Sequence, residues 1–466
     1  MHIAIIGGGF SGCMLAVHLL ERGPDGLTVT LVERRAKAGI GLAFATQAPF
    51  HLLNVRAGQM SCRPDDPDHF CRWLATHDPE AQGAALPCLR QLFVARPLYG
   101  RYLMMQLQAA IQMAAGHLRL LCATEVTAVT AATAATTGPL WRLHTATGDP
   151  ILADRVVLAT GHLPASTRVR PSWAAAAAAA YHSDPYAEGL PGRLCGNGRI
   201  LLWGAGLTMA DTFLALQAAG HAGEVVALAR RGQLPQAHRD GLAPAPQPVP
   251  TATSLAALVR TVRSQASAQM RQGGDWRQVV DGLRPHTPDL WRALGPVGQR
   301  RFLQHVRPFW DSHRHRTAPA VANQLQAACQ RGILRVTAAR LLSVRQTPAG
   351  GLVARLQPRS GGPPETLACT SLVDCRGSPY DYRRAQAPLW IQLLGDGLVS
   401  PYLLPDGAAL GLQLQADGAL TCRSDLAVQG LYALGPARIG LALESVAVPE
   451  LRAQAAALAN TLLAAA

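Results

Sequence analysis

The stretch "HIAIIGGGFSGCMLAVHLL" at residues 2–20 decides the fold, because an apolar run leads through spaced glycines into a helical pattern. Gly7 permits a tight turn, Gly9 lets the backbone approach a pyrophosphate, and Gly12 lets the helix pack closely on the strand. The first amide groups of the helix offer hydrogen-bond donors and a positive dipole to phosphates. The chain is therefore predicted to begin with a dinucleotide-binding unit.

The next strand of this unit, "LTVTLVE" at residues 27–33, ends in an acid. In units of this kind an acid at the strand end accepts hydrogen bonds from the ribose hydroxyls. We expect Glu33 to do so and to repel a 2′-phosphate, and we place Arg34 beside the same cofactor.

A second strand, glycine loop and helix, "RILLWGAGLTMADTFLAL", occupies residues 199–216. Its expected phosphate contacts are Gly204, Gly206 and Thr208. The following strand ends in Arg230 and Arg231, whose guanidinium groups suit the 2′-phosphate of NADPH, although a solvated strand end would have the same pattern. Opposite charges at the two strand ends indicate two cofactors, FAD on the first loop and NADPH on the second.

Each unit is followed by strand patterns that predict a three-stranded β-meander and a return to a glycine, Gly161 or Gly377. A late strand at 430–436 and the C-terminal helical stretch are expected to complete the first domain. The predicted fold is α/β, with two Rossmann-like dinucleotide-binding domains, β-meanders and a helical insertion. The expected domains are a discontinuous FAD-binding domain at 1–165 and 375–466, an NAD(P)H-binding domain at 198–374 and a helical insertion within it at 240–330.

The composition argues against several classes of partner. The net charge of +14 comes from arginines spread along the chain, with Lys37 the single lysine, so nucleic acid is not expected. No apolar run approaches the length of a membrane helix, and the start lacks a signal peptide pattern. Ten cysteines without C-x-x-C or zinc spacing predict reduced thiols, no metal site and a cytoplasmic location.

Longer motifs extend over most of the chain, among them "GIGLAFAT" at 39–46, "HLLNVRAGQMS" at 51–61, "FWDSHRHR" at 309–316 and "LESVAVPELR" at 443–452. With them the chain resembles the flavoproteins that have two dinucleotide-binding domains, and among these a bacterial family of FAD/NAD(P)-binding proteins. Segment 51–61 is the best candidate to lie on the flavin ring, because its few polar groups are spaced through apolar ones; a core strand and turn would look similar. The further FAD contacts expected are Gly41, Leu53, Asn54, Val55, Met60, Ser61, Val126 (through its backbone), Gly161 and Gly435.

The resemblance admits several reactions, and the residues discriminate among them. Cys62 and Cys71 lack the spacing of a redox disulfide, and Gly435-Pro436 replaces the late Gly-Asp of single-domain hydroxylases. Two-domain flavin monooxygenases share Ala159-Thr160-Gly161 and a segment like residues 181–186. The glycine that precedes this segment in enzymes that oxygenate ketones is absent here.

The resemblance therefore implies a FAD-dependent, NADPH-using monooxygenase that N-oxygenates an amine or amino acid with molecular oxygen, through a flavin C4a-hydroperoxide. The alternatives are an NAD(P)H-dependent flavin oxidoreductase or dehydrogenase that inserts no oxygen, and a flavin-bound sensor or assembly protein. No side chain is assigned to catalysis.

The helical insertion carries an unusual cluster of aromatic and basic residues near 305–316. Arg314 stands four residues after Trp310, so the two would share a helix face. Such a cluster suits an anionic or amino-acid-like small molecule, although a solvated basic helix end would have the same composition. The expected substrate contacts are His305, Trp310 and Arg314.

Overall fold

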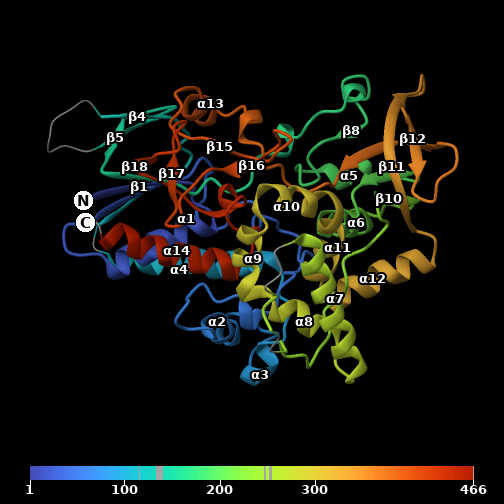
Figure 1. Cartoon of the computed structure of the whole chain (residues 1–466), viewed down its shortest axis with the longest axis horizontal. Helices are drawn as coiled ribbons and strands as arrows, with labels where there is room; N and C mark the ends of the chain where they lie inside the picture. Colours follow the sequence, from blue (N-terminus) through green and yellow to red (C-terminus); the bar gives the residue numbers. More distant parts are fainter. Residues whose placement is uncertain (115, 133–139, 246–247, 251–253, 465–466) are drawn as a thin grey trace.

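The computed structural model describes residues 1–114, 116–132, 140–245, 248–250 and 254–464, which form two lobes and a helical part (Figure 1). Both ends of the chain lie in the first lobe, and the second lobe is built from the middle of the chain. Residues 246 and 247, within the Pro-rich stretch at 243–250, lie outside the described residues.

The first lobe is built on a six-stranded sheet with the strand order β17-β18-β7-β1-β2-β3. Neighbouring strands are parallel except β17 and β18. The strands are β1 (His2–Ile6), β2 (Thr28–Val32), β3 (Leu118–Leu121), β7 (Arg155–Leu158), β17 (Ala419–Thr421) and β18 (Ala427–Ala433). Because β18 pairs with β7, the C-terminal part of the chain completes the sheet that the N-terminal part begins.

Both faces of this sheet are covered, as the alternation of buried residues along β1 requires. Ile3 and Ile5 belong to one core, and Ala4 and Ile6 belong to the core on the opposite face. The first core includes α1 (Phe10–Arg22), α2 (His69–His77), α3 (Leu86–Leu89), α4 (Arg96–Met113) and α14 (Val448–Ala464). The second lies under a three-stranded meander, β4 (Val126–Ala131), β5 (Trp141–Thr145) and β6 (Ile151–Ala153), with α13 (Pro388–Gly395) and the pair β15 (Pro401–Leu403) and β16 (Ala409–Leu412).

The apolar patterns at residues 118–129, 140–147 and 155–162 predict the three strands of the first meander, but the structure builds it from β4, β5 and β6. Residues 118–121 and 155–158 belong to the parallel sheet, where they pair with β2 and β1. Ala123 has a φ of 51°, a conformation uncommon outside glycine, and it turns the chain between β3 and β4. The expected single strand across this region is therefore two strands in two sheets.

The second lobe repeats the parallel arrangement, with the strand order β13-β12-β11-β10-β9-β14-β8. Its strands are β8 (Tyr181–His182), β9 (Ile200–Trp203), β10 (Val225–Ala229), β11 (Leu334–Gln346), β12 (Leu352–Pro358), β13 (Glu365–Cys369) and β14 (Ser371–Asp374). Strand β11 pairs in parallel with β10 and then antiparallel with β12, so one continuous strand serves both the sheet and the meander. Helices α5 (Leu190–Leu194) and α6 (Leu207–Ala218) pack beside this sheet.

Equivalent glycines begin the loop of each lobe. Gly7 has a φ of 112°, and a Cβ there would lie 2.3 Å from the carbonyl oxygen of Ala159. Gly204 has a φ of 138°, and its Cβ would lie 2.4 Å from the carbonyl oxygen of Cys375. A Cβ on Gly12 would lie 1.9 Å from the oxygen of Gly7. Each of these positions therefore requires glycine, as the tight turn and the close helix packing predict.

The helical part consists of α7 (Leu255–Arg271), α8 (Trp276–Gly282), α9 (Thr287–Ala293), α10 (Gly295–Arg301), a π-helical turn (Phe302–Val306) and α11 (Arg307–Arg314). The next helix, α12 (Pro319–Gln330), packs Val321, Leu325 and Ala328 into the core of the second sheet. It is thus the crossover helix between β10 and β11, although it falls within the range expected for the insertion. Among the described residues no helix is long and apolar enough to span a bilayer.

Candidate functional site

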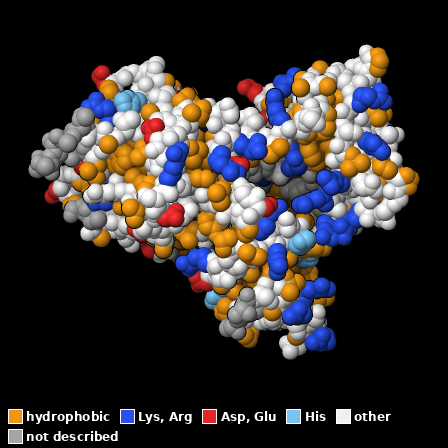
Figure 2. All heavy atoms as spheres, turned by 45° about the horizontal axis from the view of Figure 1, so that its top comes forward, with side chains coloured by type: hydrophobic (Ala, Val, Ile, Leu, Met, Phe, Trp, Pro, Cys, Tyr) orange, Lys and Arg blue, Asp and Glu red, His pale blue; other side chains and the backbone are white. Residues whose placement is uncertain are grey.

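A cavity of about 2000 Å³ lies where the two lobes and the helical part meet. Its walls come from residues 42–60 of the first lobe, from the second glycine loop and from residues 281–316 of the helical part. Figure 2 shows basic side chains gathered around the hollow between the lobes.

The second glycine loop forms one wall of this cavity, and every residue predicted there lines it: Gly204, Gly206, Thr208, Arg230 and Arg231. Gly206 caps α6 with extended backbone, and a Cβ on it would meet no atom within 4 Å. The guanidinium of Arg231 lies 5.0 Å from the ring centre of Phe309. That of Arg376 lies 3.5 Å from the ring of Trp203. This wall therefore combines an open helix N-terminus with arginines, as phosphates require.

The first glycine loop lies apart from the cavity, covered by the segment that follows β2. The N–H of Gly39 donates to the oxygen of Gly8 over 2.8 Å, and a Cβ on Gly9 would lie 3.6 Å from the Cα of Gly41. The carboxylate of Glu33, 7% exposed, accepts the N–H groups of Gly8 at 2.7 Å and Arg35 at 2.9 Å. A carboxylate has capacity for further bonds, so Glu33 remains suited to ribose hydroxyls.

The other predicted FAD contacts fall into two groups. Leu53, Asn54, Val55 and Met60 line the cavity. Those that do not line it are Arg34, Gly41, Ser61, Val126, Gly161 and Gly435. Gly435 lies near the first loop, since its Cβ would be 3.4 Å from Oγ of Ser11. Arg34 is exposed, whereas Ser61 is fully buried and donates to the oxygen of Asp66 at 2.6 Å. Val126 begins β4 at the meander.

A polar network that the sequence analysis did not single out joins the lobes beside the cavity. Asp211 on α6 forms an ion pair with Arg96 of α4 at 2.7 Å and accepts the Tyr186 hydroxyl at 2.8 Å. Nε2 of His51 donates to the backbone oxygen of Asp211 at 3.2 Å. Burial lowers the pKa of His51, so the ring is neutral near pH 7. His51 and Tyr186 lie in motifs noted above, but sequence spacing does not reveal that they meet Arg96 and Asp211.

The predicted substrate residues are only partly brought together. Arg314 lines the cavity, whereas His305 and Trp310 do not. His305 is exposed, and Trp310 packs edge-on against Phe302 with ring centres 6.4 Å apart. The expectation that Trp310 walls a pocket beside Arg314 does not match this arrangement, because the rings pack into the helical part instead.

Two half-buried histidines also line the cavity. Burial lowers the pKa of His162 to about 4. Burial, followed by the charge of Arg316, lowers the pKa of His238 to about 4. Both imidazoles are therefore neutral near pH 7, and His238 donates through Nε2 to the oxygen of Asn54 at 2.9 Å.

Comparison with known proteins identifies the first lobe. The family model described as FAD-NAD(P)-binding matches residues 4–163. Residues 4–163 thus resemble a FAD-NAD(P)-binding domain. The match includes the first glycine loop, Glu33 and segment 51–61, and it confirms the expected flavoprotein class. No curated protein sequence matches the chain significantly.

Solved structures extend the likeness beyond this FAD-NAD(P)-binding domain to the whole chain. L-lysine 6-monooxygenase from Pseudomonas syringae is 17% identical with a TM-score of 0.64, and covers 99% of each chain. Ornithine N-hydroxylase from Kutzneria is 16% identical with a TM-score of 0.61, covering 99% of this chain and 98% of the other. Cadaverine monooxygenase from Erwinia amylovora is 13% identical with a TM-score of 0.62, covering 98% and 92%. These likenesses confirm the predicted α/β fold with two dinucleotide-binding domains.

Proposed function

We propose that the protein is a FAD-dependent, NADPH-using monooxygenase that N-oxygenates a small amine or amino acid. The observation that carries the proposal is that the second glycine loop and segment 53–60 of the FAD-NAD(P)-binding domain open onto the same cavity. A hydride donor on the second loop and a flavin ring on that segment would therefore face each other. The end-to-end fold likeness to three N-hydroxylating monooxygenases supports this reading.

The residues present fit both cofactors. Gly9 and Gly206 each stand at the N-cap of a helix in extended backbone, and neither position is crowded. A pyrophosphate can therefore approach the free N–H groups of α6, and it can reach those of α1 where residues 39–41, which cover the first loop, leave room for it. Glu33 would bind the ribose of FAD, and Arg230 and Arg231 would bind the 2′-phosphate of NADPH. When bound, the flavin supplies the transfer of hydride and the activation of oxygen.

The chain itself contributes position and exclusion of water. Asp211 holds α6 of the second lobe to Arg96 of the first, so the pair fixes the distance between the two nucleotide loops. Arg96 is half-buried; burial alone would lower its pKa, but the pairing with Asp211 keeps the pKa above the usual range. The neutral His51 adds a further bond across the same boundary without adding charge.

The proposal is tested by reducing the purified FAD-loaded protein with NADPH without oxygen and then mixing it rapidly with oxygen. We expect reduction by NADPH, followed by a transient spectrum that differs from both reduced and oxidised flavin. Direct return to the oxidised spectrum, with stoichiometric hydrogen peroxide in the presence of each amine tried, would instead support an oxidoreductase that inserts no oxygen.

A further inference from the structure

Another part of the cavity wall carries a cluster of largely buried arginines, Arg284, Arg314 and Arg316. Arg314 and Arg316 are 8% and 3% exposed, and Arg284 is also largely buried. All three line the cavity next to segment 53–60. They come from two separate elements, the turn after α8 and the end of α11.

Carboxylates behind the wall hold two of these arginines in place. Glu450 accepts two hydrogen bonds from Arg284, at 2.5 and 2.8 Å, and Glu444 accepts one from Arg314 at 2.6 Å. Neither glutamate lines the cavity. The guanidinium groups are thus fixed from behind, while the residues themselves form the wall. Arg316 pairs with Asp281, which does line the cavity.

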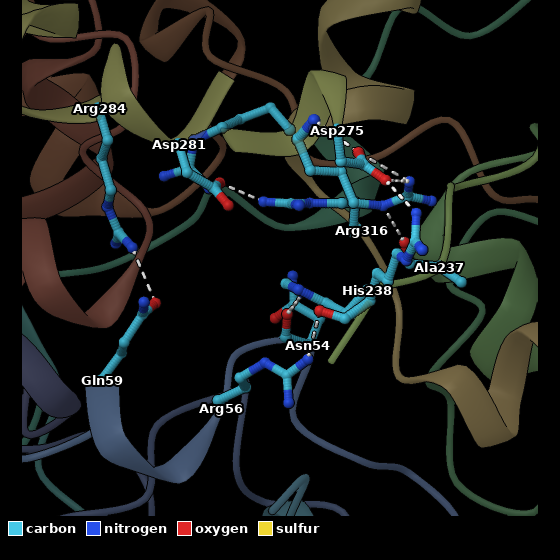
Figure 3. A network of polar contacts seen from close by, with 12 residues as sticks. Asn54, Arg56, Gln59, Ala237, His238, Asp275, Asp281, Arg284 and Arg316 are labelled. Atoms are coloured by element: carbon cyan, nitrogen blue, oxygen red, sulfur yellow. Dashed lines mark hydrogen bonds and ion pairs between the residues drawn. The ribbon is translucent and has the colours of Figure 1, made fainter. Parts of the chain in front are cut away.

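The same cluster is bonded to the segment expected to lie on the flavin ring. Arg284 donates to the side-chain oxygen of Gln59 at 3.2 Å, and His238 donates to the backbone oxygen of Asn54 at 2.9 Å. Arg56 donates to the backbone oxygen of Arg239 at 3.0 Å. Figure 3 shows residues 54–59 in contact with Arg284 of the helical part and with the segment that leads from β10 to α7. A group bound by the arginines would therefore lie next to that segment.

The hydrogen-bonding capacity of the cluster is not used up. A guanidinium has five N–H donors, and the hydrogen bonds that Arg314 and Arg316 make to described residues use one Nη atom of each, so the other Nη has no hydrogen-bond partner among those residues. Leaving a buried charged donor unpaired is costly. Burial, together with the positive charges of Arg314 and Arg277, lowers the pKa of Arg316 even though Asp281 opposes the shift. An anion beside these groups would be stabilised.

The net charge of the whole cavity also favours the binding of an anion. Of the residues that the structure describes, twelve arginines and four acidic residues line it. Three of these acids, Asp211, Asp281 and Asp311, each pair with an arginine, and the fourth, Glu188, is exposed. NADPH would bring about four negative charges, which leaves a positive excess. The part of the cavity wall that the structure describes thus contains no buried, unpaired acid to hold an ammonium group.

The cluster is separate from the expected 2′-phosphate site. Arg231 of that site packs on Phe309 near the start of α11. Arg314 stands five residues further along the same helix, about 8 Å away. The two groups of arginines therefore lie toward different ends of the helix.

We propose that the substrate of this protein is an anion, and that Arg284, Arg314 and Arg316 bind its carboxylate or phosphate groups beside segment 53–60. The proposal rests on the proposed function, since it names the class of molecule that is oxygenated. It requires a substrate whose acidic groups outnumber its ammonium groups. A diamine such as cadaverine would meet like charge on this wall.

Calorimetric titration of the FAD-loaded protein saturated with NADP⁺ tests the assignment without turnover. The probes are citrate, inorganic phosphate and cadaverine at low ionic strength. We expect citrate or phosphate to bind and cadaverine not to bind, and the better of the two anions shows whether carboxylate or phosphate is preferred. Cadaverine binding as tightly as the anions, or anion binding that disappears when NADP⁺ is present, would overturn the proposal.

Variants localise the site. Arg316→Gln should weaken anion binding at least tenfold, because a charge-assisted hydrogen bond is lost. Arg284→Lys should also weaken anion binding, because an ammonium lacks the planar fork of a guanidinium, but by less, because the positive charge is kept. This variant provides the test if Arg316→Gln does not fold. Arg292→Gln removes an exposed arginine of the helical part outside the cavity and should change nothing. Unchanged anion affinity in both cavity variants would refute the assignment.

The proposed reaction and the proposed substrate class can be refuted independently of each other. A protein that forms the transient spectrum with oxygen but binds no anion would refute only the substrate class. A protein that binds anions at these arginines but forms no such spectrum would refute only the monooxygenase reaction.

Discussion

Replacing Gly206 by valine should abolish tight binding of NADPH and leave the fold and the FAD intact. Gly206 has φ of −90° and ψ of −162°, which any residue adopts, and a Cβ there meets no atom within 4 Å. The side chain would project at the N-terminus of α6, where the pyrophosphate is expected. Gly204 is unsuitable for this test, because its φ is 138° and its Cβ would overlap the backbone of Cys375.

The size of the effect follows from the contacts that the side chain would displace. A hydrogen bond from a backbone N–H to a phosphate contributes about 1.5–3 kcal/mol. Losing one such bond raises Kd about 10- to 100-fold. We therefore expect the KM for NADPH in flavin reduction to rise by this factor, with unchanged flavin content and melting temperature.

Stopped-flow reduction of the flavin over a range of NADPH concentrations measures this directly. Gly395→Val is the matched control, because Gly395 in α13 is also uncrowded but lies outside the cavity. If Gly206→Val reduces its flavin with the KM of the unmodified protein, the second loop does not hold the pyrophosphate and the assignment is wrong.

Four further predictions concern the cofactors, the lobe boundary and pH. Gly9→Val should purify without flavin colour, because its side chain would fill the approach to the first loop; a fully yellow protein would contradict this. Replacing Arg230 and Arg231 by alanine should raise the KM for NADPH, because each lost bond to the 2′-phosphate removes about 1.5–3 kcal/mol of binding free energy. The KM for NADH should stay nearly unchanged. Asp211→Asn should slow flavin reduction by NADPH at normal flavin content, since Arg96 loses its charged partner; an unchanged rate would remove the positioning role. Burial lowers the pKa of His18, 1% exposed, to about 4, below the 6.5 of the unfolded chain. The unfolded state therefore binds more protons between these values, and stability falls as the pH drops. Chemical denaturation should show that the free energy of unfolding falls between pH 7 and pH 5, and that this fall is about 2 kcal/mol smaller in His18→Leu.

The sequence by itself determined the two nucleotide-binding units. Glycine spacing, apolar strands and the charge at each strand end are local features, and the backbone at Gly7 and Gly204 has the geometry that the motif implies. The likeness between the halves could also be foreseen. The strands that form each meander could not be foreseen, because they depend on a turn at Ala123 and on the length of β11.

Only the tertiary structure decided which side chains surround the cavity. Arg314 meets Glu444 across 130 residues, Arg96 meets Asp211 across 115, and His238 meets Asn54 across 184. The sequence marked Arg314 as a substrate contact but grouped it with Trp310 and His305, which lie elsewhere. Helical spacing predicts which residues share a face, but it does not predict what that face packs against. That is settled by the burial of apolar surface when distant segments come together, and the charged groups must then find partners within the space that remains.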